Sequence, residues 1–297
     1  MTTNKVKGGH KNKQSYANKR TGEGKEQYYT NPDVVDICVA EVQKHVDLSD
    51  RTILEPAGGT GEFIKGFYRA GFKDVISFDI EPKYRDVLEA NFLSLKDVGS
   101  GLVCITNPPF GRMNSVSVPF FNHAAKFCDY VCFLVPKSWR KWTTINRLDD
   151  SFHLVSDIEM PRDCFYLPEG NTKKGVLNTV FQVWEKRTEK REEIKVPDHK
   201  LIKKITQPKD GIVKGANFAV IQFGHGCGKA FDITGDKDFK TTTMYLHVDR
   251  QDVKDALKEI DFSEFANRTA YVEALSIQEI NYKLNERFGL PNYTGIY

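Results

Sequence analysis

Short apolar runs alternate with amphipathic segments along the first two thirds of the chain. Residues 35–46 carry apolar side chains at helical spacing, and Asn31, followed by a proline, is expected to cap that helix. An apolar run at 52–54 precedes a glycine-rich turn, an amphipathic segment at 62–70 and a second apolar run at 75–80. Strand, turn, helix and strand in this order form one βαβ unit, which predicts a parallel sheet.

The alternation continues as far as about residue 186. Apolar runs at 101–105 and 129–135 are typical of buried strands, and the segment 118–128 between them is typical of a helix. Two further strand patterns follow at 152–160 and 178–186. We therefore expect the α/β class, with a Rossmann-like sheet.

The composition changes after this region. Residues 186–200 are highly charged, contain a proline and lack a periodic apolar face, as is typical of a linker. Beyond it lie two strand patterns and two helix patterns, at 218–233, 241–248, 251–260 and 276–289. Ser276 and Glu279 have the spacing of a capping box. We expect a catalytic domain at 28–187 and a smaller α+β segment at 188–297 that recognises substrate or a protein partner.

The first 27 residues differ from the rest in charge. Residues 1–27 carry seven Lys or Arg against two Glu, with almost no large apolar side chain. This composition cannot bury a core and predicts a disordered tail. The tail is either a solubilising segment or an arm that seeks phosphates, and the net charge of +3 does not decide between them.

Cysteine usage and hydropathy indicate an intracellular protein. The six cysteines are scattered, without a CxxC pair, and most have apolar neighbours, so we expect them to be reduced and structural. His225 and Cys227 are only two potential ligands, so no metal site is expected. With no signal peptide and no apolar run of membrane-spanning length, we expect a cytoplasmic or other intracellular location and no membrane contact.

The turn after the first apolar run, EPAGGTGEF at 55–63, is the first candidate site. Gly58, Gly59 and Gly61 would let a ligand approach the backbone, and the following helix presents free N–H groups. The spacing does not match GxGxxG, which disfavours an NAD-dependent oxidoreductase, and no GK[ST] follows. A plain tight turn is the alternative. Asp79, at the end of the next apolar run, is placed to accept ribose hydroxyls, or else to cap a helix.

A rigid elbow follows the apolar run at 101–105. In TNPPFG, Pro108 and Pro109 fix two φ angles and remove two backbone donors, and they push Asn107 toward an extended conformation. The elbow can continue neither a helix nor a central strand. Its stiffness indicates that Asn107 and Phe110 are held in place for a purpose.

Together these motifs resemble a known family. EPAGGTG, FDIEP, NFLSL and TNPPFG, in that order, are similar to the S-adenosylmethionine-dependent amino-methyltransferases of the N6-adenine type. YYTNP, FLVPKSW and VFQVW resemble three further segments of that family, so the resemblance covers about residues 28–187. It implies a class I methyltransferase sheet and S-adenosyl-L-methionine as the cofactor. The tail and the C-terminal segment are not covered.

The resemblance also implies roles for individual residues. The catalytic residues would be Asn107, Pro108, Pro109 and Phe110. The cofactor-binding residues would be Tyr29, Thr30, Pro32, Glu55, Gly58, Gly59, Gly61, Asp79, Ile80, Asn91 and Phe92. Among these the glycines would line the methionine part, Asp79 would take the ribose, and Ile80, Asn91 and Phe92 would surround the adenine.

Amine chemistry explains the elbow. The lone pair of an exocyclic amine is delocalised into the ring, which makes the amine a poor nucleophile. The Asn107 amide oxygen and the Pro108 carbonyl can accept hydrogen bonds from that amine, localise the lone pair and stabilise the developing positive charge. Phe110 offers a ring for base stacking, which contributes about 1–3 kcal/mol.

Two departures from the family leave the substrate open. The family often has an acidic residue at the position of Asn91, and a tyrosine or tryptophan at that of Phe110. Adenine N6 in DNA is the first expectation, and an RNA base (adenine or guanine) or a protein glutamine is the alternative. A catalytically silent nucleic-acid-binding subunit is an alternative of another class, although intact glycines and NPPF argue against it.

The loop PKSWRKW follows the apolar run at 129–135 and mixes basic and aromatic side chains. We expect it to contact nucleic acid, DNA in preference to RNA, because the end of that strand should face the site. The residues concerned are Lys137, Trp139, Arg140 and Lys141. The alternative is a solvated loop with its tryptophans packed below.

Overall fold

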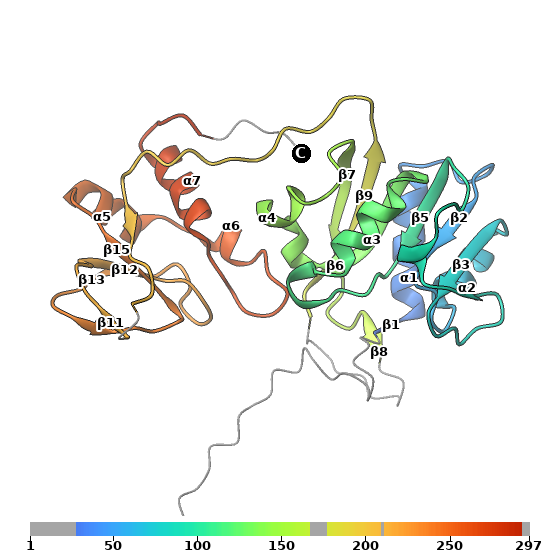
Figure 1. Ribbon diagram of the computed structural model, residues 1–297, viewed down its shortest axis with the longest axis horizontal. Helices are drawn as coiled ribbons and strands as arrows, with labels where there is room; N and C mark the ends of the chain where they lie inside the picture. Colours follow the sequence, from blue (N-terminus) through green and yellow to red (C-terminus); the bar gives the residue numbers. More distant parts are fainter. Residues whose placement is uncertain (1–27, 167–176, 209–210, 293–297) are drawn as a thin grey trace, which may run out of the picture.

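The computed structural model describes residues 28–166, 177–208 and 211–292, so the tail expected at 1–27 lies outside the described residues. A seven-stranded sheet forms the centre of the structure (Figure 1). Its strands, in spatial order, are β4 (Leu88–Glu89), β3 (Val75–Asp79), β2 (Ile53–Glu55), β5 (Leu102–Thr106), β6 (Cys128–Pro136), β9 (Thr179–Lys186) and β7 (Phe152–Glu159). β9 runs antiparallel to both of its neighbours, and the other neighbouring pairs are parallel. The predicted α/β class with a Rossmann-like sheet is confirmed.

Both faces of the central strands are buried. Leu54, Cys104 and Phe133 belong to one cluster of buried apolar side chains, whereas Ile53 and Leu134, each next to a member of that cluster along its strand, belong to a second. Strands buried on both faces have no polar alternation in their sequence. This explains why continuous apolar runs, rather than a period of two, marked these strands in the sequence.

Helices cover the two faces of the sheet. α1 (Pro32–Gln43) and α2 (Glu62–Arg69) share a buried cluster with one face, and α3 (Ser117–Ala124) and α4 (Trp142–Ile145) share one with the other. Short 3₁₀ turns in the described connections are η2 (Phe92–Ser94), η3 (Arg112–Asn114) and η4 (Lys137–Arg140). Among the described residues, no helix has the length and apolar composition that crossing a membrane requires.

The start of α1 differs from the sequence prediction in one respect. Pro32 occupies the first helical position as expected, but the side chain of Asn31 makes no capping hydrogen bond. Its amide instead donates to the carbonyl of Asp163, beside the short strand pair β1 (Tyr29–Thr30) and β8 (Phe165–Tyr166). The prediction that Asn31 caps α1 was wrong because a tertiary partner competes for its side chain.

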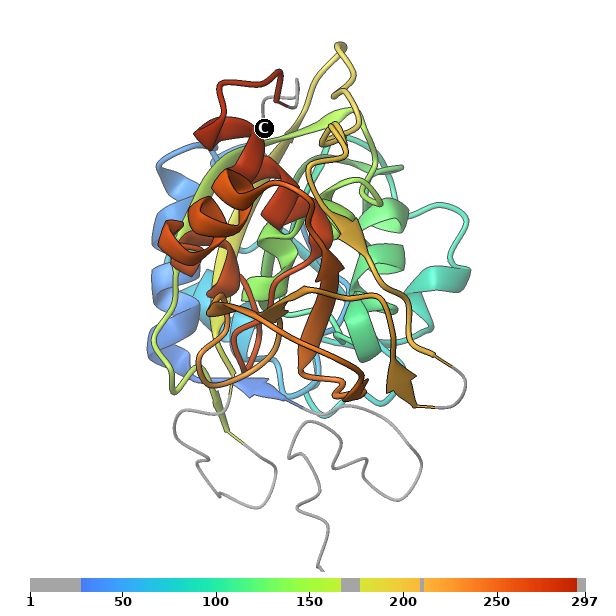
Figure 2. The same ribbon diagram turned by 90° about the vertical axis from the view of Figure 1, so that its left-hand side faces the viewer.

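Residues beyond the large sheet form a second, smaller α+β unit, as the sequence predicted. An antiparallel sheet has the order β10 (Lys203–Lys204), β15 (Thr243–His247), β12 (Phe218–Ile221) and β13 (Ala230–Asp232), with a separate pair β11 (Ile212–Val213) and β14 (Lys237–Asp238). The helices are α5 (Gln251–Glu259), α6 (Ser263–Ala266) and α7 (Ile277–Arg287). The capping box of Ser276 and Glu279 is present at the start of α7. Figures 1 and 2 show this unit beside β6, β9 and β7, with α6 and α7 between the two sheets.

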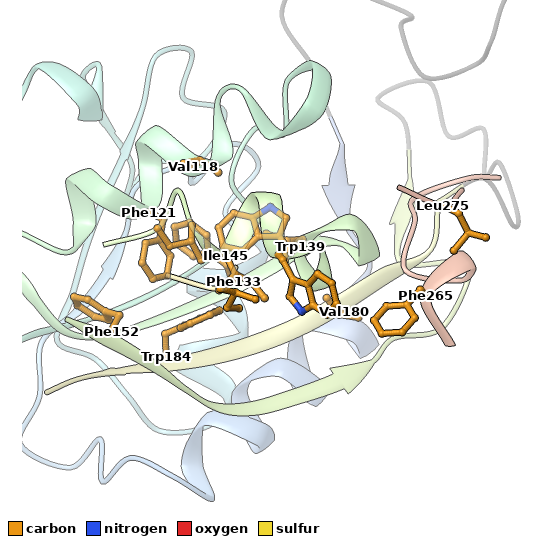
Figure 3. Close-up of a cluster of buried hydrophobic side chains, with 14 of the residues drawn as sticks. Val118, Phe121, Phe133, Trp139, Ile145, Phe152, Val180, Trp184, Phe265 and Leu275 are labelled. Carbon is orange, nitrogen blue, oxygen red and sulfur yellow. The ribbon is translucent and has the colours of Figure 1, made fainter. Parts of the chain in front are cut away.

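One apolar core runs through both units. Phe121, Phe133 and Trp184 from the large sheet and its helix α3 are fully buried, and the same cluster includes Phe265 and Leu275 (Figure 3). The link is made by Trp142 on α4, whose ring lies 5.2 Å from that of Phe265 and 5.3 Å from that of Tyr282. The charged linker seen in the sequence therefore joins two units that share buried surface.

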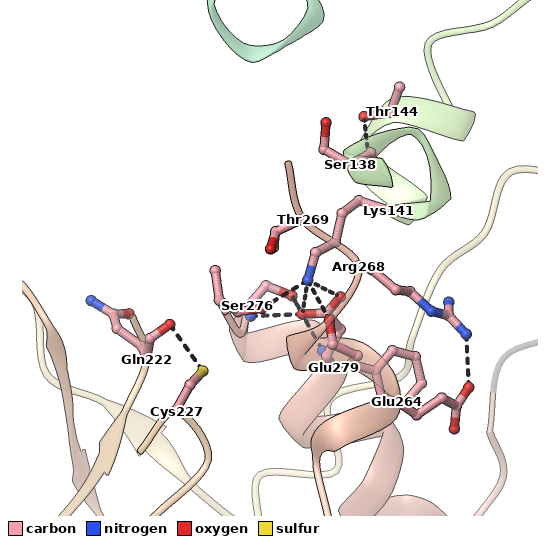
Figure 4. A network of polar contacts seen from close by, with 12 residues as sticks. Ser138, Lys141, Thr144, Gln222, Cys227, Glu264, Arg268, Thr269, Ser276 and Glu279 are labelled. Atoms are coloured by element: carbon pink, nitrogen blue, oxygen red, sulfur yellow. Dashed lines mark hydrogen bonds and ion pairs between the residues drawn. The ribbon is translucent and has the colours of Figure 1, made fainter. Parts of the chain in front are cut away.

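A buried ion pair reinforces this junction. The ammonium of Lys141 donates to both carboxylate oxygens of Glu279, at 2.8 and 3.1 Å, and to the carbonyls of Phe265 and Ala274 (Figure 4). Glu279 is only 2% exposed. Burial lowers the pKa of Lys141, and the Glu279 carboxylate opposes that effect. Four acceptors around one ammonium hold the loop after β6 against α6 and α7.

Replacing Lys141 with methionine should destabilise the protein by about 3–5 kcal/mol, because the Glu279 carboxylate would stay buried without its counterion. Urea unfolding of both proteins measures the difference. Lys190→Met is the matched control: its partner Asp150 is half exposed, so the change should be below about 1 kcal/mol. Equal losses for the two variants would show that the junction does not depend on Lys141.

Candidate active site

The order of the strands brings two loops together. β2 and β5 are neighbours and run parallel, with Leu54 opposite Cys104, so their carboxyl ends finish at the same edge of the sheet. The glycine turn at 56–61 follows β2, and the elbow at 107–111 follows β5. The chain runs outward from β2 through β3 to β4 and then returns to β5, so the direction of winding reverses at this point. Ligands of open α/β sheets bind at such a reversal.

A cavity of about 790 Å³ lies at this edge, within the range of small-molecule sites. Most of the predicted site residues line it: Tyr29, Thr30, Gly58, Gly59, Asp79, Ile80, Asn91, Phe92, Asn107, Pro108, Pro109 and Phe110. Pro32, Glu55 and Gly61 were predicted but are not among the lining residues. Lining residues that the sequence analysis missed include Tyr28, Thr60, Glu62, Glu81, Leu93 and Arg112.

Gly58 and Gly61 are required mainly because neighbouring side chains leave no room for a Cβ atom. A Cβ atom at Gly58 would lie 2.3 Å from Ser77 Oγ, and one at Gly61 would lie 2.4 Å from the ring of Tyr84. Gly59 and Gly61 also have positive φ angles of 46° and 77°. The Cα atoms of Gly58 and Gly61 therefore pack directly against β3 and the loop that follows it. The backbone of the turn forms part of the cavity wall.

Asp79 ties the turn to β3. Its Oδ2 accepts the N–H of Gly59 at 2.9 Å, and its Oδ1 accepts the N–H of Glu81 at 2.8 Å. Each carboxylate oxygen keeps a further lone pair for a ligand hydroxyl. Glu81 and Glu62, the latter paired with Lys65, also line the cavity, and Arg112 is the only Lys or Arg among its described lining residues. The wall around the glycine turn is therefore acidic and suits a cationic ligand.

Aromatic side chains close the cavity next to the glycine turn. β1 and β8 pair so that Tyr29 lies opposite Tyr166, with ring centroids 5.5 Å apart. The ring of Tyr29 passes close to Gly59, where a Cβ would approach it to 3.3 Å, and its hydroxyl accepts from Lys83 at 2.8 Å. Tyr166 bonds the hydroxyl of Thr60 at 3.2 Å. Two segments far apart in sequence thus meet beside the glycine turn, and Figure 1 shows β1 and β8 next to each other.

Asn107 carries an unpaired acceptor. Its amide nitrogen donates to the carbonyl of Tyr28 at 2.9 Å, which fixes the amide plane. Its Oδ1 is buried and has no hydrogen-bond partner within the described residues. Buried acceptors are almost always paired, so an orphan at the wall of a cavity indicates that a ligand donor completes it.

The ring of Phe110 already has aromatic neighbours. Phe110 is 6% exposed, with the ring of Tyr28 stacked on it at 5.9 Å and that of Phe165 against it edge-on at 6.0 Å. A stacking ligand would therefore use the opposite face of Phe110 or displace Tyr28.

Two of the three residues predicted to surround the adenine already have partners inside the protein. The Asn91 side chain accepts from the N–H of Leu93 and caps η2. Phe92 is 1% exposed and packs against Phe120 and His123. Ile80 is 51% exposed and lines the cavity, so it is available to pack against a planar ligand.

Glu55 lies beneath the turn rather than in the cavity. Its Oε1 accepts from the N–H of Ala57 and the hydroxyl of Thr106, while its Oε2 has no partner within the described residues. Burial raises the pKa of Glu55 to about 8, although these two hydrogen bonds oppose the shift. The neighbouring Ser77 hydroxyl, opposite Glu55 in the sheet register, is likewise buried and unpaired.

The four residues predicted to bind nucleic acid have partners inside the protein. Trp139 is fully buried and donates to Ser117. Arg140 is paired with Asp157, and Lys137 with Glu159. Lys141 is held at the junction described above. These contacts match the alternative of a loop with its tryptophans packed below, and they leave little of the four side chains for a nucleic acid.

In the described part of the chain, no three His, Cys, Asp or Glu side chains gather in an arrangement that could hold a metal ion.

Solved structures share part of this fold. A candidate RNA methyltransferase from Pyrococcus horikoshii is 16% identical, with a TM-score of 0.46 over 57% of this chain and 91% of its own. The M protein of the type I restriction enzyme EcoKI is 15% identical, with a TM-score of 0.43 over 54% of this chain and 44% of its own. TrmN from Thermus thermophilus is 14% identical, with a TM-score of 0.38 over 52% and 48%. No protein-family model matches the chain, and no curated protein matches it.

The pKa of Glu55 gives a prediction for stability. Because its pKa in the folded protein, about 8, lies above the ordinary value of 4.5, folding favours the protonated carboxyl. That contribution is complete below about pH 4.5 and is lost as the pH rises toward about 8, at up to about 1.4 kcal/mol per pH unit. Glu55→Gln cannot ionise, so its free energy of unfolding should fall less than that of the unmodified protein over this range.

Urea unfolding at a series of pH values measures this difference. Glu89→Gln is the control, because it removes an exposed carboxylate from the edge strand β4. Profiles that stay parallel for Glu55→Gln and the unmodified protein would contradict the raised pKa.

Proposed function

We propose that the protein transfers a methyl group from S-adenosyl-L-methionine to the exocyclic amine of a nucleobase, with adenine N6 in DNA as the preferred substrate. The observation that carries the proposal is the unpaired, buried Oδ1 of Asn107 in a cavity that also contains the glycine turn and Asp79. One cavity thus contains both a hydrogen-bond acceptor for an amine, Asn107 Oδ1, and the glycine turn and Asp79 that suit a nucleoside-like ligand.

The residues present fit the cofactor. Bound S-adenosyl-L-methionine supplies an electrophilic methyl group on a positively charged sulfonium. The carboxylates of Asp79 and Glu81 provide negative charge around the cavity, and the backbone of Gly58 and Gly59 lines it. Asp79 retains lone pairs for two ribose hydroxyls, and the exposed side chain of Ile80 offers an apolar surface for the adenine.

Asn107 and Pro108 would act on the substrate amine. The Asn107 oxygen accepts a hydrogen bond from one N–H of the amine, and the carbonyl of Pro108 accepts one from the other. These bonds localise the nitrogen lone pair and stabilise positive charge as the methyl group arrives. The bond from Asn107 to the carbonyl of Tyr28 prevents the amide from turning its nitrogen toward the amine. The Asn107 acceptor is already fixed before the substrate binds, so it needs little reorganisation during the reaction.

The aromatic side chains support a planar substrate. Tyr28 and Phe110 line the cavity on the side of the elbow, and their rings are suited to stacking a base. A glutamine amide of a protein substrate would use the two acceptors but would gain nothing from the rings. This difference favours a nucleobase over a protein glutamine.

We assign residues 188–297 to substrate or partner recognition. The unit shares the core of residues 28–187, so it would present its surface at a fixed position relative to the cavity. Because adenine in RNA, guanine in RNA and protein glutamine are the competing substrates, the test offers all of them. Labelled S-adenosyl-L-methionine is incubated with duplex DNA, single-stranded DNA, RNA or protein lysate, and mass spectrometry identifies the product. Label in adenine of DNA is expected, whereas label in protein alone would overturn the proposal.

Asn107→Ala should reduce turnover of the preferred substrate by about a hundred-fold or more, because a preorganised acceptor in a buried site is lost. Cofactor affinity, measured by calorimetry, should stay within about two-fold, because Asn107 lies on the substrate side of the cavity. Asn122→Ala is the matched control, since that amide also donates to a backbone carbonyl, of Arg147, but lies outside the cavity. An unchanged kcat for Asn107→Ala would remove the assigned role.

Asp79→Asn should weaken cofactor binding by about ten- to a hundred-fold, because charge-assisted hydrogen bonds to the ribose contribute about 1.5–3 kcal/mol. Calorimetric titration with S-adenosyl-L-methionine measures the change, and circular dichroism checks that the variant stays folded. Glu89→Gln removes an exposed carboxylate on the neighbouring strand and should leave the affinity unchanged. Equal affinities for all three proteins would contradict the ribose assignment.

A further inference from the structure

The loop at 111–115, directly after the elbow, has an unusual backbone. Gly111, Met113 and Asn114 all have positive φ angles, of 67°, 54° and 61°. A left-handed conformation is easy for glycine and tolerated by asparagine, but it is unfavourable for methionine. Strained residues persist where the surrounding structure holds them, and they cluster at functional sites.

Several contacts hold this loop rigidly. The buried amide of Asn114 donates to the hydroxyls of Thr144 and Ser138, at 3.1 and 3.3 Å. The guanidinium of Arg147 donates to the carbonyl of Met113 at 3.1 Å. Gly111 is packed so tightly that a Cβ atom there would lie 2.6 Å from Ser115. The strain is therefore imposed by tertiary contacts rather than by local preference.

The rigid loop presents an apolar side chain to water at the rim of the cavity. Met113 is 82% exposed, and its neighbours Gly111, Arg112 and Ser115 all line the cavity. Arg112 is exposed, and its guanidinium makes no ion pair or hydrogen bond with the described residues. An apolar tip and a cation are thus held side by side at the entrance to the proposed substrate site.

We propose that this loop is a wedge for base-paired nucleic acid: Met113 enters the base stack at the position of the extruded target base, while Arg112 binds an adjacent phosphate. The proposal rests on the proposed function and narrows its substrate to a duplex. A paired base must leave the double helix to enter the cavity of the protein. Apolar side chains inserted between base steps compensate for the stacking that is lost. Methionine suits this role because its side chain is long, unbranched and polarizable. A single strand would need no wedge.

The test compares one DNA in two forms. Fragmented genomic DNA is used either as duplex or after heat denaturation, and transfer of labelled methyl from S-adenosyl-L-methionine gives kcat/KM for each form. Met113→Ala should lower kcat/KM on the duplex by about ten-fold or more and on denatured DNA by less than about two-fold. Met113→Leu should restore most of the loss. Leu88→Ala, which shortens an exposed apolar side chain on the edge strand β4 outside the cavity, is the control and should change neither value.

Arg112 is tested by the salt dependence of duplex binding. Arg112→Gln should reduce the slope of log K against log salt concentration by about one. Arg51→Gln, at the opposite end of β2, should leave the slope unchanged.

Three results would overturn the wedge. They are equal losses for Met113→Ala on both forms of DNA, no loss on either form, and activity of the unmodified protein on denatured DNA alone. Each of these leaves the proposed function standing. Absence of methyl transfer to any nucleic acid by the unmodified protein would instead remove the proposed function, and the wedge with it.

Discussion

The parallel pairing of β2 with β5 is the constraint on which the site depends. The glycine turn and the elbow are about fifty residues apart in sequence, and neither forms a cavity alone. Backbone hydrogen bonds between the two strands fix where both loops begin. β3, paired on the other side of β2, then delivers Asp79 to the same edge, where it bonds the N–H of Gly59. A one-residue slip in either register would turn these side chains to the opposite face of the sheet.

The same edge of the sheet concentrates unsatisfied polar atoms. Glu55 Oε2, Ser77 Oγ and Asn107 Oδ1 are buried and have no partner among the described residues. Glu55 ends β2, Ser77 lies within β3 and Asn107 follows β5, and these three strands are adjacent. Each such atom costs free energy, which the core on either face of the sheet must offset. Two of them lie under the turn, and only Asn107 lines the cavity. Glu55 and Ser77 therefore belong to the support of the turn, whereas the oxygen of Asn107 is available to a ligand.

The sequence was sufficient where local pattern and tertiary structure agree. Apolar runs buried on both faces gave the strands, and the order of the motifs led to a cavity lined by Asp79 and Asn107. The sequence was insufficient where contacts with a distant segment determine the local structure. β1 and β8 have two residues each and are stabilised by each other, so no period could reveal them or the role of Tyr28. Glu55 and Gly61 belong to the right motif, but their side-chain positions face strands and a tyrosine ring rather than the cavity.

The loop after β6 shows how composition alone can mislead about surface. Lys137, Trp139, Arg140 and Lys141 have the mixture of charge and aromatic rings that nucleic-acid-binding loops use. In the structure each charge meets a carboxylate of the same chain, and Trp139 enters the core. The loop at 111–115 shows the reverse, because nothing in its composition stands out and only its backbone angles and exposure distinguish it. A cation that is paired with a carboxylate inside the protein has little left to offer a phosphate, whereas the guanidinium of Arg112, at the rim of the cavity, has no ion pair with the described residues. The electrostatic attraction for a polyanion near this site therefore depends more on Arg112 than on the basic loop after β6.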